Sequence, residues 1–369
     1  MPRSVGQVVN LQADCQSASG YYLDLAQSGL RMPIGTDLVL HEHADAAEIV
    51  LDGRRLGQVT EEAAHRYGTP LAVPLMDLRL EKADLLDKFG VPEAQVDAFH
   101  FDAAPLESHL ARVEAVAGAA FPARCQAHFD SIQYIAGETK LVPVGMAIGP
   151  FSLMTKLMAD PIVPIATAGM GVTGAEDQGV LMAERCLALA EWTVHRSLRA
   201  QARAGARAII VCEPAANVVY LSPKQIEKGS DIFERFVMQP ALRMKAVLDS
   251  AGVDLILHDC GELNSFMVRQ FGERVHPAIL SLGSSRRLWE DAALVPKDVV
   301  LFGNLPTKNF YSDAVVPVER VRELTLELIG NMRRAAHPHI VGSECDVLHV
   351  PESAAAIQRK LNVMLTCGR

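Results

Sequence analysis

The sequence has no excess of positive charge and no long uninterrupted apolar segment. Its 369 residues include 35 Lys and Arg against 44 Asp and Glu, a formal net charge of -9, which argues against a general nucleic-acid-binding protein because such proteins present a basic surface. The most apolar segment, residues 141–158, is interrupted by Pro143, Gly145, Gly149 and Pro150, so no run reaches membrane-spanning length. No N-terminal stretch has the layout of a signal peptide. We therefore expect a cytoplasmic protein that binds neither membrane nor nucleic acid.

Paired cysteines and glycine-rich phosphate loops are also lacking. The seven cysteines are odd in number and irregularly spaced, which favours a reduced cytoplasmic setting over a disulfide framework. None of them forms the Cys-x-x-Cys pair of a strong zinc motif. Cys186 and Cys212 lie in helical and strand-like patterns and are expected to be small core residues. No strand-like run is followed by the Gly-rich turn of a dinucleotide site.

The chain does contain a regular alternation of apolar runs and amphipathic stretches. Hydrophobic residues make up 49% and charged residues 21%, which permits a sizeable core. Helical patterns over 180–204, 232–250 and 318–336 separate the runs. Strands that alternate with helices predict a parallel α/β sheet, and eight of them favour a (β/α)8 TIM barrel, with an open doubly wound sheet as the alternative. The expected strands are residues 71–75, 96–101, 142–148, 208–212, 253–258, 278–282, 299–302 and 339–341.

The first part of the chain does not show this alternation of apolar runs and amphipathic stretches. Residues 1–65 are expected to form an N-terminal extension of helices and a hairpin, and residues 66–369 the barrel. The hairpin is predicted over 51–56, because Asp52 and Gly53 form a dipeptide typical of tight turns.

Two separated segments suggest a metal site. His258 and Cys260 stand two apart where an apolar run ends, and residues two apart on a strand face the same way. Cys345 follows another run, and the carboxyl ends of barrel strands meet at one mouth. One imidazole and two thiolates are a zinc set with a fourth position left open. The competing interpretation is a hydrogen-bonded core histidine and two packing cysteines.

Three other polar residues are expected at strand ends. Glu213 is a candidate fourth ligand or substrate partner, or alternatively a carboxylate at a helix N-terminus. Asn304 is a candidate for orienting substrate, or a turn residue. Asp77 presents the same choice at the end of the first run. Asp259 and Glu344 would face away from the metal ligands on regular strands and are left out of the set.

Methionines cluster near the segment that follows the third run. Met154 and Met170 are candidates for lining a mouth that receives a flat corrinoid or another apolar ligand. Ordinary core filling is the alternative, since Met adapts to irregular gaps.

Several short segments together resemble the uroporphyrinogen decarboxylase superfamily, in its zinc-dependent methyltransferase branch. The Gly-Pro-Phe and Gly-Asn-Leu segments mark the superfamily, and His-x-Cys with a distant Cys marks the branch. The resemblance implies a (β/α)8 barrel, zinc held by His258, Cys260 and Cys345, and methyl transfer between a corrinoid protein and a thiol or methoxy compound. The segments are 149–153, 213–215, 221–223, 257–261, 302–305 and 342–345.

The sequence departs from the decarboxylases themselves. The decarboxylases share an Arg-Gln-Ala-Gly-Arg segment that binds substrate carboxylates, whereas residues 75–82 here contain one arginine, Arg79. A substrate with many carboxylates needs several positive partners, so decarboxylation is disfavoured. The chain also lacks the Asp-x-His-x-x-Gly pattern that binds a corrinoid, so a methylcobamide would be carried by a partner protein. A metal-free decarboxylase or lyase and a non-catalytic corrinoid-protein partner stay open as alternative functions. The oligomeric state is also open, with a homodimer among the options.

Overall fold

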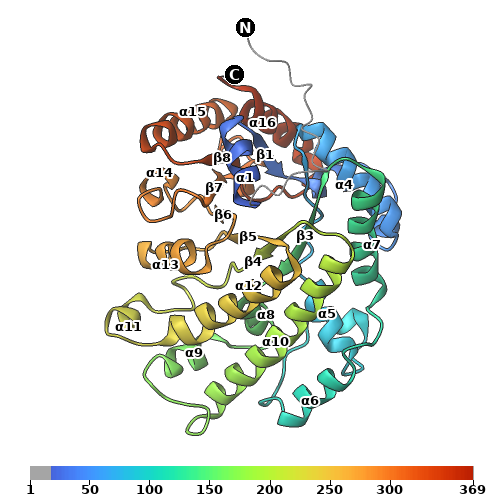
Figure 1. Ribbon diagram of the computed structural model, residues 1–369, viewed down its shortest axis with the longest axis vertical. Helices are drawn as coiled ribbons and strands as arrows, with labels where there is room; N and C mark the ends of the chain where they lie inside the picture. Colours follow the sequence, from blue (N-terminus) through green and yellow to red (C-terminus); the bar gives the residue numbers. More distant parts are fainter. Residues whose placement is uncertain (1–17, 369) are drawn as a thin grey trace.

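The computed structural model describes residues 18–368, which form one curled parallel sheet surrounded by helices (Figure 1). The strand order is β1-β8-β7-β6-β5-β4-β3-β2, so β2 to β8 follow one another in sequence order, β1 lies beside β8, and β1 and β2 form the two ends of the sheet. A doubly wound sheet would reverse its order partway; the TIM-barrel prediction is confirmed. The strands are β1 Arg31–Ile34, β2 Leu71–Ala72, β3 Val142–Ile148, β4 Ala208–Cys212, β5 Asp254–Asp259, β6 Ile279–Leu282, β7 Val300–Leu305 and β8 His339–Asp346.

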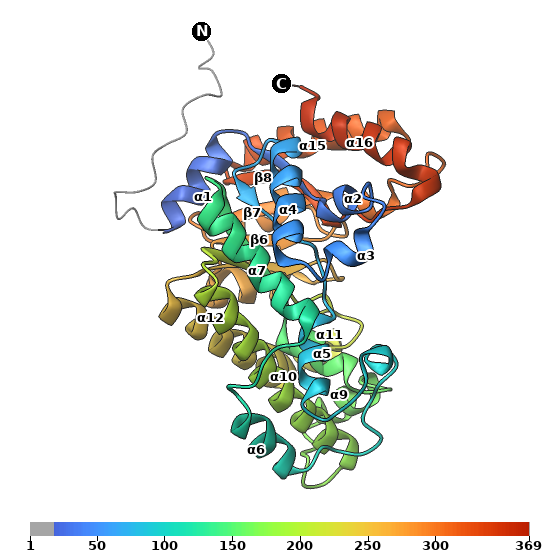
Figure 2. The same ribbon diagram turned by 90° about the vertical axis from the view of Figure 1, so that its right-hand side faces the viewer.

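Helices cover the outside of the sheet (Figures 1 and 2). The helical stretches predicted over 180–204, 232–250 and 318–336 are confirmed as α10, as η2 with α12, and as α15. The α-helices are α1 Ala18–Gln27, α2 Thr36–Leu40, α3 Ala46–Ile49, α4 Gly53–Tyr67, α5 Leu80–Asp87, α6 Glu107–Ala115, α7 Ala123–Glu138, α8 Pro150–Lys156, α9 Ile162–Ala168, α10 Gln178–Arg203, α11 Pro223–Glu227, α12 Gln239–Ala251, α13 Ser265–Gln270, α14 Leu288–Asp291, α15 Val318–Ala335 and α16 Ala354–Thr366. Single turns of 3-10 or π geometry are η1 Glu93–Gln95, η2 Glu234–Met238, η3 Phe271–Val275, η4 Thr307–Asn309 and η5 Pro351–Ser353. None of the helices within residues 18–368 has both the length and the apolar composition to cross a bilayer.

One predicted strand is wrong and one strand was not predicted. Residues 96–101 form no strand, because Phe99 and Phe101 pack edge to face, with ring centroids 5.2 Å apart, in a small aromatic cluster. Strand β1 takes its place in the count of eight. Its Arg31 and Pro33 break the apolar pattern, yet Arg31 is buried because its guanidinium donates to the carbonyls of Met364 (3.1 Å) and Cys367 (2.7 Å).

The predicted hairpin over 51–56 is also wrong, because Asp52 and Gly53 begin helix α4. The Asp52 carboxylate accepts the Arg55 N–H at 3.1 Å, an N-cap that satisfies one of the helix's free donors. A Cβ on Gly53 would lie 2.2 Å from the Asp130 Cβ of α7. Glycine therefore serves close packing of α4 on α7, which lie side by side in both views (Figures 1 and 2).

The sheet ends approach each other through side chains. Thr36 Oγ1 donates to the Val73 carbonyl at 2.6 Å, and Thr69 Oγ1 lies 3.2 Å from Met32 Sδ. Apolar side chains from every strand fill the interior, among them Met32, Leu71, Met146, Ile210, Ile256, Ile279, Phe302 and Ile340. A filled interior leaves the carboxyl ends of the strands as the place for a site.

Candidate metal centre

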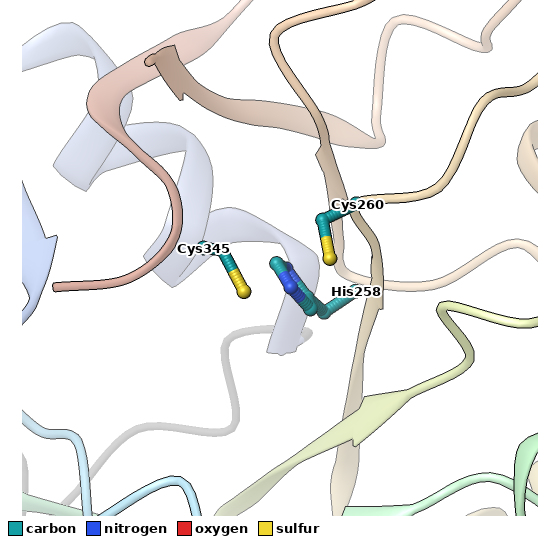
Figure 3. A group of neighbouring side chains, drawn as sticks. All are labelled: His258, Cys260 and Cys345. Carbon is teal, nitrogen blue, oxygen red and sulfur yellow. The ribbon is translucent and has the colours of Figure 1, made fainter. Parts of the chain in front are cut away.

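Three potential metal ligands come together at the carboxyl ends of β5 and β8. One ligand atom each from His258, Cys260 and Cys345 lies within 4.8 Å of the others. Figure 3 shows the imidazole and both sulfurs turned toward one another. His258 is buried and the two cysteines are partly exposed, so the group opens toward solvent at the mouth. The predicted convergence of these residues is present, and occupancy by a metal stays a prediction.

The imidazole of His258 is oriented by the neighbouring strand. Its Nδ1 lies 2.8 Å from Ser281 Oγ on β6, where the ladder pairs the two residues. Its Nε2 is buried and has no hydrogen-bond partner among the described residues. Buried polar atoms normally have partners, and metal-binding histidines typically hydrogen-bond through the other ring nitrogen. The residues present therefore fit a metal ion that takes Nε2.

The two thiols shift each other's pKa in opposite directions. The hydrogen bond with Cys345 lowers the Cys260 pKa, and His258 and Lys308 lower it further. The same hydrogen bond and burial raise the Cys345 pKa. A thiol with a lowered pKa is the better nucleophile and metal ligand, so Cys260 is the more reactive of the two.

Lys308 is a site residue that the sequence analysis missed. It lies on η4, just beyond β7, and its backbone N–H donates to the Glu344 carboxylate at 3.4 Å. Burial alone would lower its pKa, but attraction to Cys260, Cys345 and Glu344 raises it overall. The alternation of side chains along a strand does not predict where a residue in the following turn lies. The sequence indicated only that Lys308 comes four residues after Asn304, near the end of a strand.

The two carboxylates left out of the ligand set are held elsewhere. Glu344 accepts the Ser284 N–H at 3.2 Å and hydroxyl at 2.5 Å, and the Lys308 backbone N–H at 3.4 Å. Asp259 is buried, which raises its pKa well above the ordinary value, and its Oδ1 accepts the Gly261 N–H at 2.8 Å. Neither belongs to the group that could hold a metal.

Glu213 joins β4 to the start of helix α8. Its carboxylate oxygens accept the backbone N–H groups of Phe151 (3.1 Å) and Ser152 (2.9 Å), which favours the helix N-terminus interpretation. Burial raises its pKa to about 7. A Cβ on Gly149 would lie 2.1 Å from the Glu213 carboxyl carbon, which gives a steric reason for Gly in the Gly-Pro-Phe segment. A role for Glu213 toward substrate stays a prediction.

Asn304 and Asp77 hold loops near the mouth. The Asn304 amide donates to the carbonyls of Gly283 (2.8 Å) and Arg286 (2.9 Å), which fixes the loop after β6. Asp77 accepts the Arg79 N–H at 3.2 Å and forms an ion pair with Arg124. Their proposed contacts with substrate stay predictions.

The two candidate corrinoid-facing methionines differ in exposure. Met154 is fully buried in the layer between helices and sheet, whereas the Met170 side chain, beyond α9, is 70% exposed. Only Met170 can meet a ligand without rearrangement of the core. Cys186 and Cys212 are buried as expected.

A parallel barrel with an imidazole and two thiols at its mouth defines a protein of the TIM-barrel-like class with a candidate metal centre. More specifically, the chain belongs to the uroporphyrinogen decarboxylase (URO-D) family, whose model matches residues 37–356. No curated protein matches it. A solved structure, a methyltransferase from Methanosarcina mazei, superposes with a TM-score of 0.62 at 14% identity, covering 93% of this chain and 98% of that one. At this identity the likeness shows a shared fold.

Proposed function

We propose that the protein is a cytoplasmic zinc-dependent methyltransferase that moves a methyl group between a methylcobamide on a separate corrinoid protein and a thiol or a methoxy or methylated small molecule. The observation that carries the proposal is the His258–Cys260–Cys345 group with its unpartnered Nε2. Membership of the URO-D family and the fold shared with a methyltransferase support an enzyme of this general kind.

The residues present divide the work in a simple way. His258, Cys260 and Cys345 would hold zinc and leave one position open, the arrangement of catalytic rather than structural sites. When bound, zinc supplies a Lewis acid that lowers the pKa of a thiol or polarises the oxygen or sulfur of a methyl donor. Ser281 engages the imidazole through Nδ1, which would leave Nε2 to bind the metal. Met170 is the exposed apolar side chain for a corrinoid ligand.

The position of Arg79 argues against the alternative of a metal-free decarboxylase. Its guanidinium donates to Asp97 at 2.8 Å and to Glu93 at 2.6 Å. An arginine already engaged by two carboxylates is poorly placed to grip the carboxylates of a substrate.

Metal content of the purified protein tests the proposal. We expect about one zinc per chain, lost in Cys260→Ala and in Cys345→Ala, because each removes one of three ligands. Cys186→Ala, a buried cysteine on α10, is the matched control and should keep its zinc. The zinc-loaded protein should then demethylate methylcobalamin in the presence of one of a panel of thiols.

Equal zinc content in all four proteins would place the metal elsewhere. Absence of stoichiometric zinc after reducing, chelator-free purification would overturn the proposal and favour the decarboxylase alternative.

A further inference from the structure

One carboxyl group at the mouth has no part in the candidate metal centre. Asp346 is the last residue of β8 and directly follows Cys345. The residue is buried, with 7% exposed, and its Oδ1 has no hydrogen-bond partner among the described residues. Buried polar atoms normally have partners, so Oδ1 is suited to a donor that a ligand brings.

The pairing of β8 with β1 fixes the direction of this side chain. Asp346 pairs with Ile34, and paired residues on neighbouring strands face the same side of a sheet. Ile34 belongs to the core inside the barrel. His258 faces the same way, since it pairs with Cys212 of that core. Asp346 and His258 therefore both face the interior from the carboxyl ends of their strands, where this fold binds small molecules.

No positive side chain compensates the Asp346 carboxylate. Across residues 18–368 it forms no ion pair, and burial and then Asp37 of α2 raise its pKa well above the ordinary value. Asp37 has its own partners: its carboxylate accepts the N–H of His349, three residues beyond Asp346, at 2.7 Å and lies 3.2 Å from His41 Nδ1. Asp346 thus lacks both a hydrogen-bond donor and an opposite charge, and a protonated amine supplies both.

We propose that Asp346 is a specificity-determining residue that binds a protonated amine on the small-molecule substrate, whose N–H donates to Oδ1. This inference rests on the proposed function, because it gives a class to the small molecule that takes part in methyl transfer: one that carries an ammonium group. A sulfonate or carboxylate at the same place would meet Asp346 as a like charge. The contact does not involve the metal, so it can be measured separately from methyl transfer.

Ligand-observed NMR on the full-length protein at neutral pH tests the inference with three probes of similar shape. Trimethylammonium has a positive charge and an N–H donor. Tetramethylammonium keeps the charge without a donor, and tert-butanol keeps a donor without the charge. The variant is Asp346→Asn, which preserves the size of the side chain and an acceptor oxygen but removes the charge. Asp231→Asn, at an exposed aspartate between α11 and η2, is the matched control.

Wild type should bind trimethylammonium about tenfold more tightly than either of the other probes, because it alone brings both the donor and the charge. Asp346→Asn should lose this preference and bind tert-butanol within about twofold of wild type, whereas Asp231→Asn should keep the preference. A thermal melt checks the fold of each variant, and the ranking of probes by wild type depends on no variant. Equal binding of the three probes to wild type, or an unchanged preference in folded Asp346→Asn, would overturn the inference.

The zinc content of the same samples judges the proposed function separately. Stoichiometric zinc without a preference for trimethylammonium would overturn the inference alone. A preference for trimethylammonium without zinc would support the Asp346 contact and overturn the proposed function.

Discussion

His258 shows how a single side chain depends on its neighbour. Its ring is fixed through Nδ1 by Ser281, a buried hydroxyl on the next strand. Hydrogen bonds of this kind set the tautomer and raise the basicity of a metal-binding imidazole. The metal affinity that we propose for the centre would therefore depend on a residue outside the ligand set.

Ser281→Ala should weaken zinc binding by about 10- to 100-fold while the protein stays folded. Competition with a chromophoric chelator measures the affinity, and a thermal melt without metal checks the fold. Ser250→Ala, an exposed serine whose hydroxyl donates to the Val247 carbonyl of its own helix, is the matched control. Unchanged zinc affinity in Ser281→Ala would show that packing alone orients the imidazole.

At this scale the sequence predicts strand ends better than turns. His258 and Cys260 follow from strand alternation, and Cys345 follows from the meeting of strand ends in a barrel. Lys308 could not be found in this way, because its contact with Glu344 depends on the path of η4 across the mouth. The hydrogen-bond donors to Glu213 lie on α8, the helix that follows β3, and a local sequence pattern does not predict this contact either.

Among the elements, α5, α10 and β3 meet at a buried carboxyl group. Glu81 on α5 accepts the Ser197 hydroxyl of α10 at 2.7 Å and lies 3.4 Å from the Ile148 N–H of β3. Burial raises its pKa to about 7. The folded protein therefore keeps this carboxyl protonated at pH values where the unfolded chain has lost the proton.

Because its pKa is raised, Glu81 makes the folded protein less stable as pH rises. The stability contributed by Glu81 is fully present below pH 4.5, its ordinary pKa, and is lost as pH rises through about 7. Glu81→Gln should remove this loss, so the difference in unfolding free energy between wild type and variant should change by roughly 3 kcal/mol across that range. Urea melts at several pH values measure it, with exposed Glu327→Gln as control. Parallel pH profiles for wild type and Glu81→Gln would contradict the burial argument.

Strands were predicted correctly where an apolar run pairs in the sheet and its side chains make no other dominant contact. Seven of the expected strands are present, from β2 to β8. Residues 96–101 failed because their aromatic rings pack with one another, and β1 was missed because its arginine is buried against carbonyls of the C-terminal segment. The Asp52-Gly53 dipeptide predicts a turn, but Gly53 is needed for the close contact between α4 and α7, which the local sequence does not reveal.

For the whole molecule, β1 connects the first residues of the barrel to the strand that carries Cys345. Arg31 pairs with Val341 and Met32 with Gly342. The Ile34 N–H donates to Ser343 Oγ at 2.9 Å, two residues before Cys345. The order of β2 to β8 was predictable from the sequence, whereas β1 and its pairing with β8 required the structure.

The predicted boundary between residues 65 and 66 is tested by a fragment of residues 66–369. Truncating buried side chains such as Met32 and Ile34 costs roughly 2–5 kcal/mol each, a large part of the ~5–15 kcal/mol that stabilises a typical domain. We therefore expect the fragment to lose its cooperative melt and its zinc. A fragment that begins at residue 18, and so keeps β1, is the control. A cooperative melt with zinc retained in 66–369 would support the boundary and contradict this expectation.

The position of β8 in the strand order also bears on when the centre can form. Cys345 lies on β8, the last strand along the chain among the described residues, and β8 pairs with β1, the first of them. A nascent chain that has already exposed His258 and Cys260 holds two donors without the third. If the centre holds a metal as proposed, all three ligands would be present only after β8 has been made, so loading would come late in biogenesis.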